Sequence, residues 1–153
     1  MSWTQILFLD LREWEWVGIL LARLTVGLLF LLSGRGKLFR NDRRQQMQNT
    51  LREANIPFPE LNALLVSVVE FVFGFLLMVG AATPLSCVML SGVMLVAIAT
   101  IQIQNIKSSG PIDWLSEFLY LPEVVYLIIL VWLLLSGPGW FSVDHLIMSH
   151  THL

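Results

Sequence analysis

Three ionisable side chains interrupt stretches of sequence that are otherwise apolar. They are Arg23, Glu70 and Glu123, and the polar Gln102 lies at the end of another such stretch. A charge in the hydrocarbon core of a bilayer costs at least ~2.5 kcal/mol unless a partner or water stabilises it. Groups kept in such surroundings commonly pair with one another, bind a polar ligand or carry protons, so these four residues form the candidate site.

Two interpretations of this site stay open. In the first, Arg23 and Glu70 form a buried ion pair that fixes the register of two helices, while Glu123 reaches toward the membrane surface. In the second, Arg23, Glu70, Glu123, Gln102 and Lys37 line a polar cavity for a small ligand or a proton path. One arginine does not neutralise two carboxylates unless Lys37 reaches the site or one carboxyl is protonated. A protonated glutamate would suit a neutral polar head such as that of a quinone.

The elements that carry these residues are four long apolar stretches, at residues 17–33, 62–80, 85–103 and 119–136. Each has the length of a helix across a bilayer, which needs roughly 17 to 25 residues. Charged residues make up 13% of the 153-residue chain, against roughly 25% in an ordinary soluble domain. We therefore expect an all-α polytopic membrane protein, an antiparallel bundle of four transmembrane helices with short interfacial helical segments.

Glycine and proline mark the expected ends of the helices. Gly34 follows the first stretch, residues 80–84 separate the second from the third, and residues 137–139 follow the fourth. Glycine adopts positive φ and proline lacks an amide hydrogen, so both stop helices. Because residues 80–84 are so few, the second and third helices should form an antiparallel hairpin. We expect an interfacial segment at 1–16, a membrane domain at 17–146 and a flexible tail at 147–153.

The depth of each charge follows from the rise of about 1.5 Å per residue in a helix. We expect the first helix to end near Ser33 and the second to begin near Asn62. Arg23 and Glu70 would then lie at the same depth, which makes them the central pair of the predicted site.

Helical spacing also predicts which faces point inward. Arg23 shares a face with Gly27, and Ser67, Glu70 and Gly74 share another, because residues three and four apart lie on one side of a helix. Small residues beside a polar one let two helices approach closely. We expect both faces to point into the bundle.

The stretch 34–60 holds six of the nine lysines and arginines of the chain. Its middle, from Asp42 to Ala54, is polar and compatible with a helix. Since cytoplasmic loops of membrane proteins are rich in these residues, we expect it to be cytoplasmic, with both termini outside.

The cysteine and the histidines of the chain say less about its function. Cys87 is the single cysteine, which excludes a disulfide or dithiol within this chain. His145, His150 and His152 are sparse and lie near the C-terminus, so we expect no metal site.

Three segments together carry a resemblance to a known family. They are LLARLTVGLLFLLSGRGKLF, VVEFVFGFLLMVGAATP and GPGWFSVDHL, and over about residues 17 to 146 the chain resembles the DoxX family of small four-helix bacterial membrane proteins. The chain keeps the positions Arg23, Lys37, Glu70 and Asp144, of which Asp144 would cap or tether the tail. The motif glycines that the resemblance marks as structural are Gly27, Gly34, Gly74, Gly80, Gly137 and Gly139.

The resemblance implies a component of quinone-linked or redox-stress systems in the bacterial plasma membrane. We expect an anchor or quinone-interacting subunit, with a noncovalent quinone as its cofactor, the bilayer and a soluble redox protein as partners, and no nucleic acid. A homo-oligomer stays open, and so does any catalytic activity. One alternative is a scaffold that recruits a soluble partner through residues 35–56, and another is a transporter of a small molecule or protons.

Overall fold

The structure is a computed structural model that describes residues 14–107, 110–139 and 142–151. All regular elements in these ranges are helices, so the expected all-α membrane fold is confirmed. The long helices are α2 (Glu15–Phe39), α4 (Pro59–Val79), α5 (Thr83–Ala97) and α8 (Pro122–Ser136). The shorter ones are α3 (Asn41–Glu53), the π-helix η2 (Ile98–Gln102), α6 (Ile103–Asn105), α7 (Pro111–Leu119) and α9 (Val143–Thr151).

Three spans are long and apolar enough to cross a bilayer in the described part of the chain. They are α2, α4 and the continuous run Thr83–Asn105, in which η2 and α6 extend α5. A fourth crossing would take α7 and α8 together as one broken span, and these two helices bend by 63° at their junction. Alone, α8 has 15 residues, or about 22 Å, which is shorter than the roughly 30 Å of the hydrocarbon core.

The helix expected at 119–136 is wrong at its start, because α8 begins at Pro122. Proline disfavours the helical conformation in the residue before it, and Leu121, which precedes Pro122, is extended with ψ of 124°. The chain breaks there and α8 begins again at Pro122, whose missing N–H costs nothing in the first turn of a helix.

The expected end of the first helix near Ser33 is also wrong, because α2 continues to Phe39. Gly34 does not stop the helix. A Cβ at this position would lie 2.7 Å from the backbone oxygen of Ser67, so glycine allows α4 to pack directly on α2. Gly27, two turns before Gly34 on α2, does the same, since a Cβ there would meet the backbone of Met78. Gly74 does so on α4, where a Cβ would meet the backbone of Leu31.

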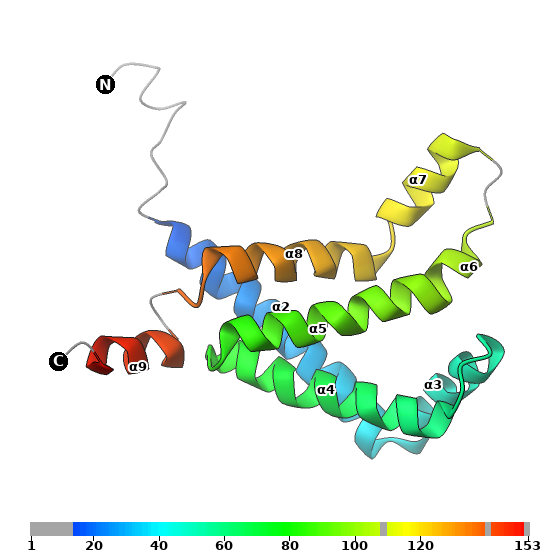
Figure 1. Cartoon of the computed structure of the whole chain (residues 1–153), viewed down its shortest axis with the longest axis horizontal. Helices are drawn as coiled ribbons and strands as arrows, with labels where there is room; N and C mark the ends of the chain where they lie inside the picture. Colours follow the sequence, from blue (N-terminus) through cyan, green and yellow to red (C-terminus); the bar gives the residue numbers. More distant parts are fainter. Residues whose placement is uncertain (1–13, 108–109, 140–141, 152–153) are drawn as a thin grey trace.

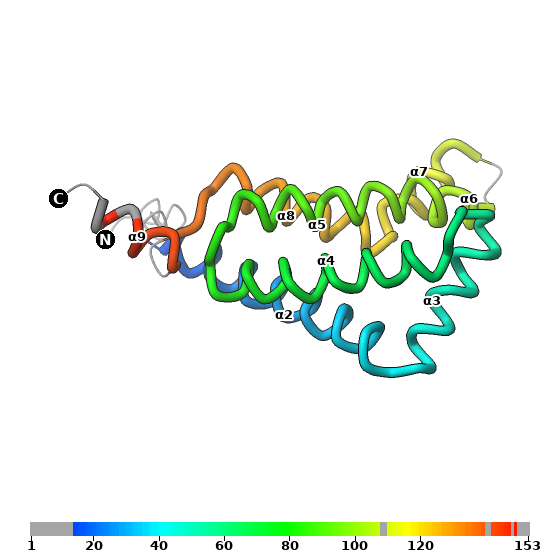
Figure 2. Tube along the Cα trace, turned by 60° about the horizontal axis from the view of Figure 1, so that its bottom comes forward, coloured from blue at the N-terminus to red at the C-terminus, as the bar shows by residue number. Residues whose placement is uncertain are grey.

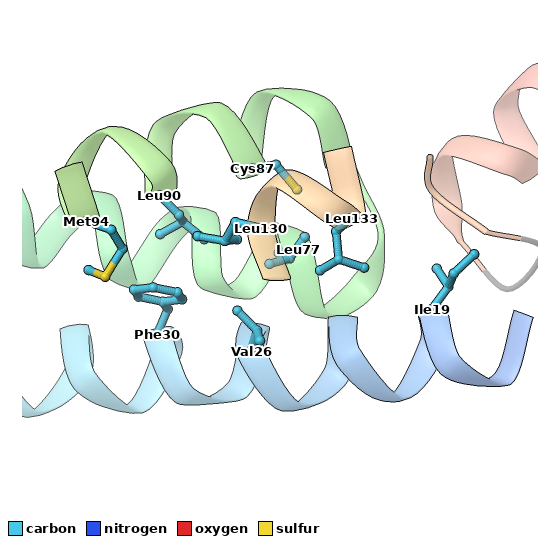
Figure 3. Packing of buried hydrophobic residues seen from close by; sticks show 9 residues of the cluster. All are labelled: Ile19, Val26, Phe30, Leu77, Cys87, Leu90, Met94, Leu130 and Leu133. Atoms are coloured by element: carbon cyan, nitrogen blue, oxygen red, sulfur yellow. The ribbon is translucent and has the colours of Figure 1, made fainter. Parts of the chain in front are cut away.

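The four long helices form two pairs, with α2 on α4 and α5 on α8, and the turn at Gly80 joins the pairs as the expected hairpin (Figure 1). Buried apolar side chains from all four helices fill the space between the pairs, among them Phe30, Leu77, Leu90 and Leu130 (Figure 3). Many apolar side chains on the outer faces, such as Leu28, are exposed, as expected for helices that contact lipid.

The two ends of the bundle differ (Figure 2). At one end, here called the α3 end, lie α3, α6 and α7; at the other, the α9 end, α9 lies near the start of α2. Helix α3 covers the stretch in which the sequence analysis found a helix-compatible middle. The expected tail from 147 onward is helical up to Thr151, and most of the expected N-terminal segment, residues 1–13, lies outside the described residues.

Candidate functional site

Glu70 forms an ion pair with Lys37, near the middle of α4. The Lys37 ammonium lies 2.8 Å from each carboxylate oxygen of Glu70, and the Ser33 hydroxyl donates to Oε2 at 2.9 Å. The Glu70 side chain is 4% exposed and that of Lys37 is 22% exposed. Three donors thus stabilise one buried carboxylate, which is the arrangement that a charge in an apolar environment needs.

This pair depends on the length of α2. Ser33 and Lys37 are four residues apart on a continuous helix and so lie on one face. Gly34 between them brings α4 close enough for both to reach Glu70. Sequence reasoning missed Ser33 because it ended the helix there, although the spacing of Ser33 and Lys37 carried the signal.

A second polar pair joins the other two helices. The side-chain amide of Gln102 donates to Oε1 of Glu123 at 2.6 Å. Gln102 is the last residue of η2, and Glu123 lies in the first turn of α8. Oε2 of Glu123 is buried and has no hydrogen-bond partner among the described residues. A π-helix is rare and frequently occurs at functional sites, where the extra residue in its turn changes the direction of nearby side chains.

Both pairs line one cavity of about 680 Å³. Its remaining walls are largely apolar and include Phe30 and Tyr126, whose rings lie edge to face with centroids 6.1 Å apart. Helix α3 contributes Met47, Thr50 and Leu51, of which Leu51 is 4% exposed. Clefts of roughly 300 to 1,000 Å³ with apolar walls and a few convergent polar groups are typical small-molecule sites.

The cavity brings together four of the five predicted site residues, namely Lys37, Glu70, Gln102 and Glu123. Arg23 is not among them. It is 2% exposed, and its guanidinium donates to the carbonyl oxygen of Pro138, beside Gly80 and therefore at the α9 end.

The expected pairing of Arg23 with Glu70 is therefore wrong. The two were placed at one depth by ending the first helix near Ser33, six residues before its end at Phe39. In the actual antiparallel register Gly27 faces Met78, so Arg23 is level with Gly80, about 15 Å along the helix axis from Glu70.

Near Arg23, the C-terminal segment with α9 is hydrogen-bonded to the turn between α4 and α5. The Asp144 carboxylate accepts from the backbone N–H groups of Ala82 and Thr83, each at 2.7 Å, and the Asp144 N–H donates to the Gly80 carbonyl at 3.0 Å. Asp144 thus caps the start of α5 and tethers α9. Gly80 has φ of 72°, and a Cβ there would lie 2.7 Å from the Arg23 guanidinium, so a side chain at this position would be excluded. The remaining motif glycines, Gly137 and Gly139, also have positive φ.

Metal ligands do not gather in the described ranges, where no cluster of three histidine, cysteine, aspartate or glutamate side chains occurs. Of the three C-terminal histidines, His152 lies outside those ranges.

Comparison with known proteins identifies the family. The sequence model of the DoxX family matches residues 18–103, which is more than half of the chain. The chain belongs to the DoxX family. No curated protein and no solved structure matches it. The DoxX match runs from α2 to α6 and so includes Lys37, Glu70 and Gln102, whereas Glu123 and Asp144 lie beyond it.

Proposed function

We propose that this DoxX protein is a quinone-interacting membrane subunit of a redox complex and binds a quinone ring in the cavity between its helices. The observation that supports this most strongly is the meeting of two polar pairs, from α2, α4, η2 and α8, in an otherwise apolar chamber. A chamber of this composition suits a ligand that is apolar except for a few hydrogen-bonding atoms.

The chemistry of a quinone ring fits the residues present. The ring is flat and carries two oxygen atoms on opposite sides, and Phe30 and Tyr126 offer aromatic surfaces for it. An ammonium has three N–H donors, and in the described part of the chain Lys37 uses them on the two oxygens of Glu70 only, so one donor remains for a ligand oxygen. Gln102 likewise has a second amide N–H for a quinone oxygen, and Oε2 of Glu123 would accept from a hydroxyl of the reduced quinol.

The rest of the assignment follows from the family resemblance and from charge. A soluble redox partner would exchange electrons with the bound quinone, because most of this chain is committed to the membrane helices. The arginines of α3 and the preceding turn favour a cytoplasmic α3 end in a bacterial cell, by the positive-inside rule. The cavity would then open near the cytoplasmic face of the plasma membrane, where such a partner would dock.

The scaffold alternative has less support from the contacts of α3. Arg40 pairs with Asp42 at 3.4 Å and Arg52 pairs with Glu60 at 3.2 Å, so two of the four arginines of residues 40–52 are balanced within the chain. Contacts of this exposed kind contribute little energy, but they reduce the charge available to an acidic partner. The cavity has no role in a scaffold.

The test is a titration of the purified protein in lipid nanodiscs with short-chain ubiquinone and menaquinone analogues. We expect saturable binding to the wild type and a loss of affinity of about tenfold or more in Lys37→Gln and Glu70→Gln, since hydrogen bonds to charged groups contribute about 1.5–3 kcal/mol. Lys107→Gln is the matched control, because Lys107 is exposed and does not line the cavity. Absence of saturable wild-type binding, or undiminished binding in both site variants, would contradict the proposal.

A further inference from the structure

The cavity is open along one side. Several of its lining residues are exposed on the surface of the protein: Asn55 and Pro57 on the segment before α4, and Val96, Ala99 and Gln104 on the run from α5 to α6. Val96, Ala99 and Gln104 border a slot beside the run from α5 to α6, and Asn55 and Pro57 border the mouth of the cavity at the α3 end. In Figure 1, α4 and α5 spread apart from their common turn toward the α3 end.

The slot extends well into the apolar part of the bundle. From Gln104 to Val96 it follows the helix for eight residues, or about 12 Å. Gln104 lies at the α3 end, whereas Val96 is 58% exposed and belongs to a span of mean hydropathy 2.1. Val66 of α4 also lines the cavity, and it lies 13 residues before the end of α4 at Val79, as Val96 lies 13 residues after the start of α5 at Thr83. The inner part of the slot therefore faces the hydrocarbon of the bilayer.

Helix α3 covers the cavity at the α3 end. Helix α3 packs on both α2 and α4, and its apolar side chains Met47 and Leu51 form the wall of the cavity at the α3 end. Leu51 is buried, so α3 packs tightly on its neighbours at this wall. A water-soluble ring would have to pass the rim formed by Asn55 and Pro57.

We infer that the ligand of the cavity is an amphiphile with a long apolar tail, which enters from the bilayer and leaves its tail lying in the slot between α4 and α5. This inference rests on the proposed function and names the class of quinone that the site accepts. The polar ring lies beside Lys37 and Glu70, while the tail passes Val66 and Val96 into the lipid. A ring without a tail lacks this second set of contacts.

The first experiment blocks the slot. Val96→Trp places an indole between α4 and α5, and Val88→Trp is the matched control, because Val88 lies on the same helix, is 53% exposed and does not line the cavity. Both are titrated in nanodiscs with a dimethoxy-methyl-benzoquinone and with the same ring bearing a decyl tail. In Val96→Trp we expect the affinity for the tailed compound to fall by at least about tenfold, the effect of losing the burial of about two methylene groups. Val88→Trp should bind both compounds like the wild type.

The outcomes separate the two proposals. If neither compound binds the wild type, the proposed function is wrong and this inference fails with it. If both bind and Val96→Trp leaves the tailed compound unaffected, or weakens the two compounds equally, the slot is not the path of the tail while the quinone site stands.

A second experiment uses the unmodified protein, so that it does not depend on the folding of a variant. A benzoquinone with a photoreactive group at the end of its decyl tail is bound and irradiated, and the labelled peptides are identified by mass spectrometry. Labels on α4 near Val66 or on α5 near Val96 support the inference. Labels on α3 or on residues 54–57 would overturn it, because the tail would then point to the aqueous side.

Discussion

At the scale of single residues, the two carboxylates of the cavity differ in the number of hydrogen bonds that they accept. Glu70 has an ammonium and a hydroxyl on its oxygens, whereas Glu123 has one amide. A carboxylate that is fully satisfied by the protein holds two helices together, and one with an unused oxygen can bind a ligand. We therefore assign Glu70 mainly to holding Lys37 in place and Glu123 to contact with the ligand.

The Lys37–Glu70 pair gives a stability prediction. Lys37→Met removes the charge that balances a buried carboxylate, and we expect the free energy of unfolding to fall by about 3 kcal/mol. Adding Glu70→Gln should recover most of this loss, because no buried charge then remains. Reversible unfolding in detergent micelles measures both, with Lys107→Met as the control. Equal losses in the single and double variants would show that the pair is not coupled.

The sequence identified these residues more reliably than their partners. A charge in an apolar stretch can be read directly from the order of residues, and Arg23 and Glu70 are indeed buried. Their partners depend on where each helix ends, and a helix end moved by six residues carries a side chain about 9 Å along the axis. This is why Lys37, assigned to a loop, proved to be the partner of Glu70.

At the scale of elements, the glycines of α2 and α4 determine how the site is assembled. A Cβ at Gly74 would lie 2.6 Å from the backbone nitrogen of Leu31, and backbone atoms cannot move aside as a flexible side chain can. The resemblance marked Gly74 as structural, and the structure supplies the reason. The π-helix η2 and the bend before Pro122 had weaker signals, since no residue type marks a π-helix and one proline was the only sign of the bend.

Substitution of these glycines should separate the helices. We expect Gly74→Ala to lower the free energy of unfolding by about 1–3 kcal/mol, as overpacking does, and to weaken quinone binding by moving Glu70 away from Lys37. Gly92→Ala is the control, because a Cβ there would meet no atom within 4 Å. In this variant stability should be unchanged or raised by up to about 1 kcal/mol. Similar losses in both variants would mean that close packing of α2 and α4 is unimportant.

At the scale of the whole molecule, polar contacts join the helices at the α9 end of the bundle, and the cavity lies toward the α3 end. The contacts of Arg23 with Pro138, and of Asp144 with the turn after α4, link the ends of the four long helices at the α9 end. At the α3 end the two helix pairs separate, and the cavity fills the space between them. A fixed end and an open end let a ligand enter between the pairs without loss of the fold.

The most direct test of a quinone site is a density map of the protein in nanodiscs loaded with the decyl benzoquinone. We expect the ring in the cavity of about 680 Å³, with its oxygens within hydrogen-bonding distance of Lys37 or Gln102. A map in which side chains or lipid chains fill this space, with the quinone elsewhere or absent, would contradict the account.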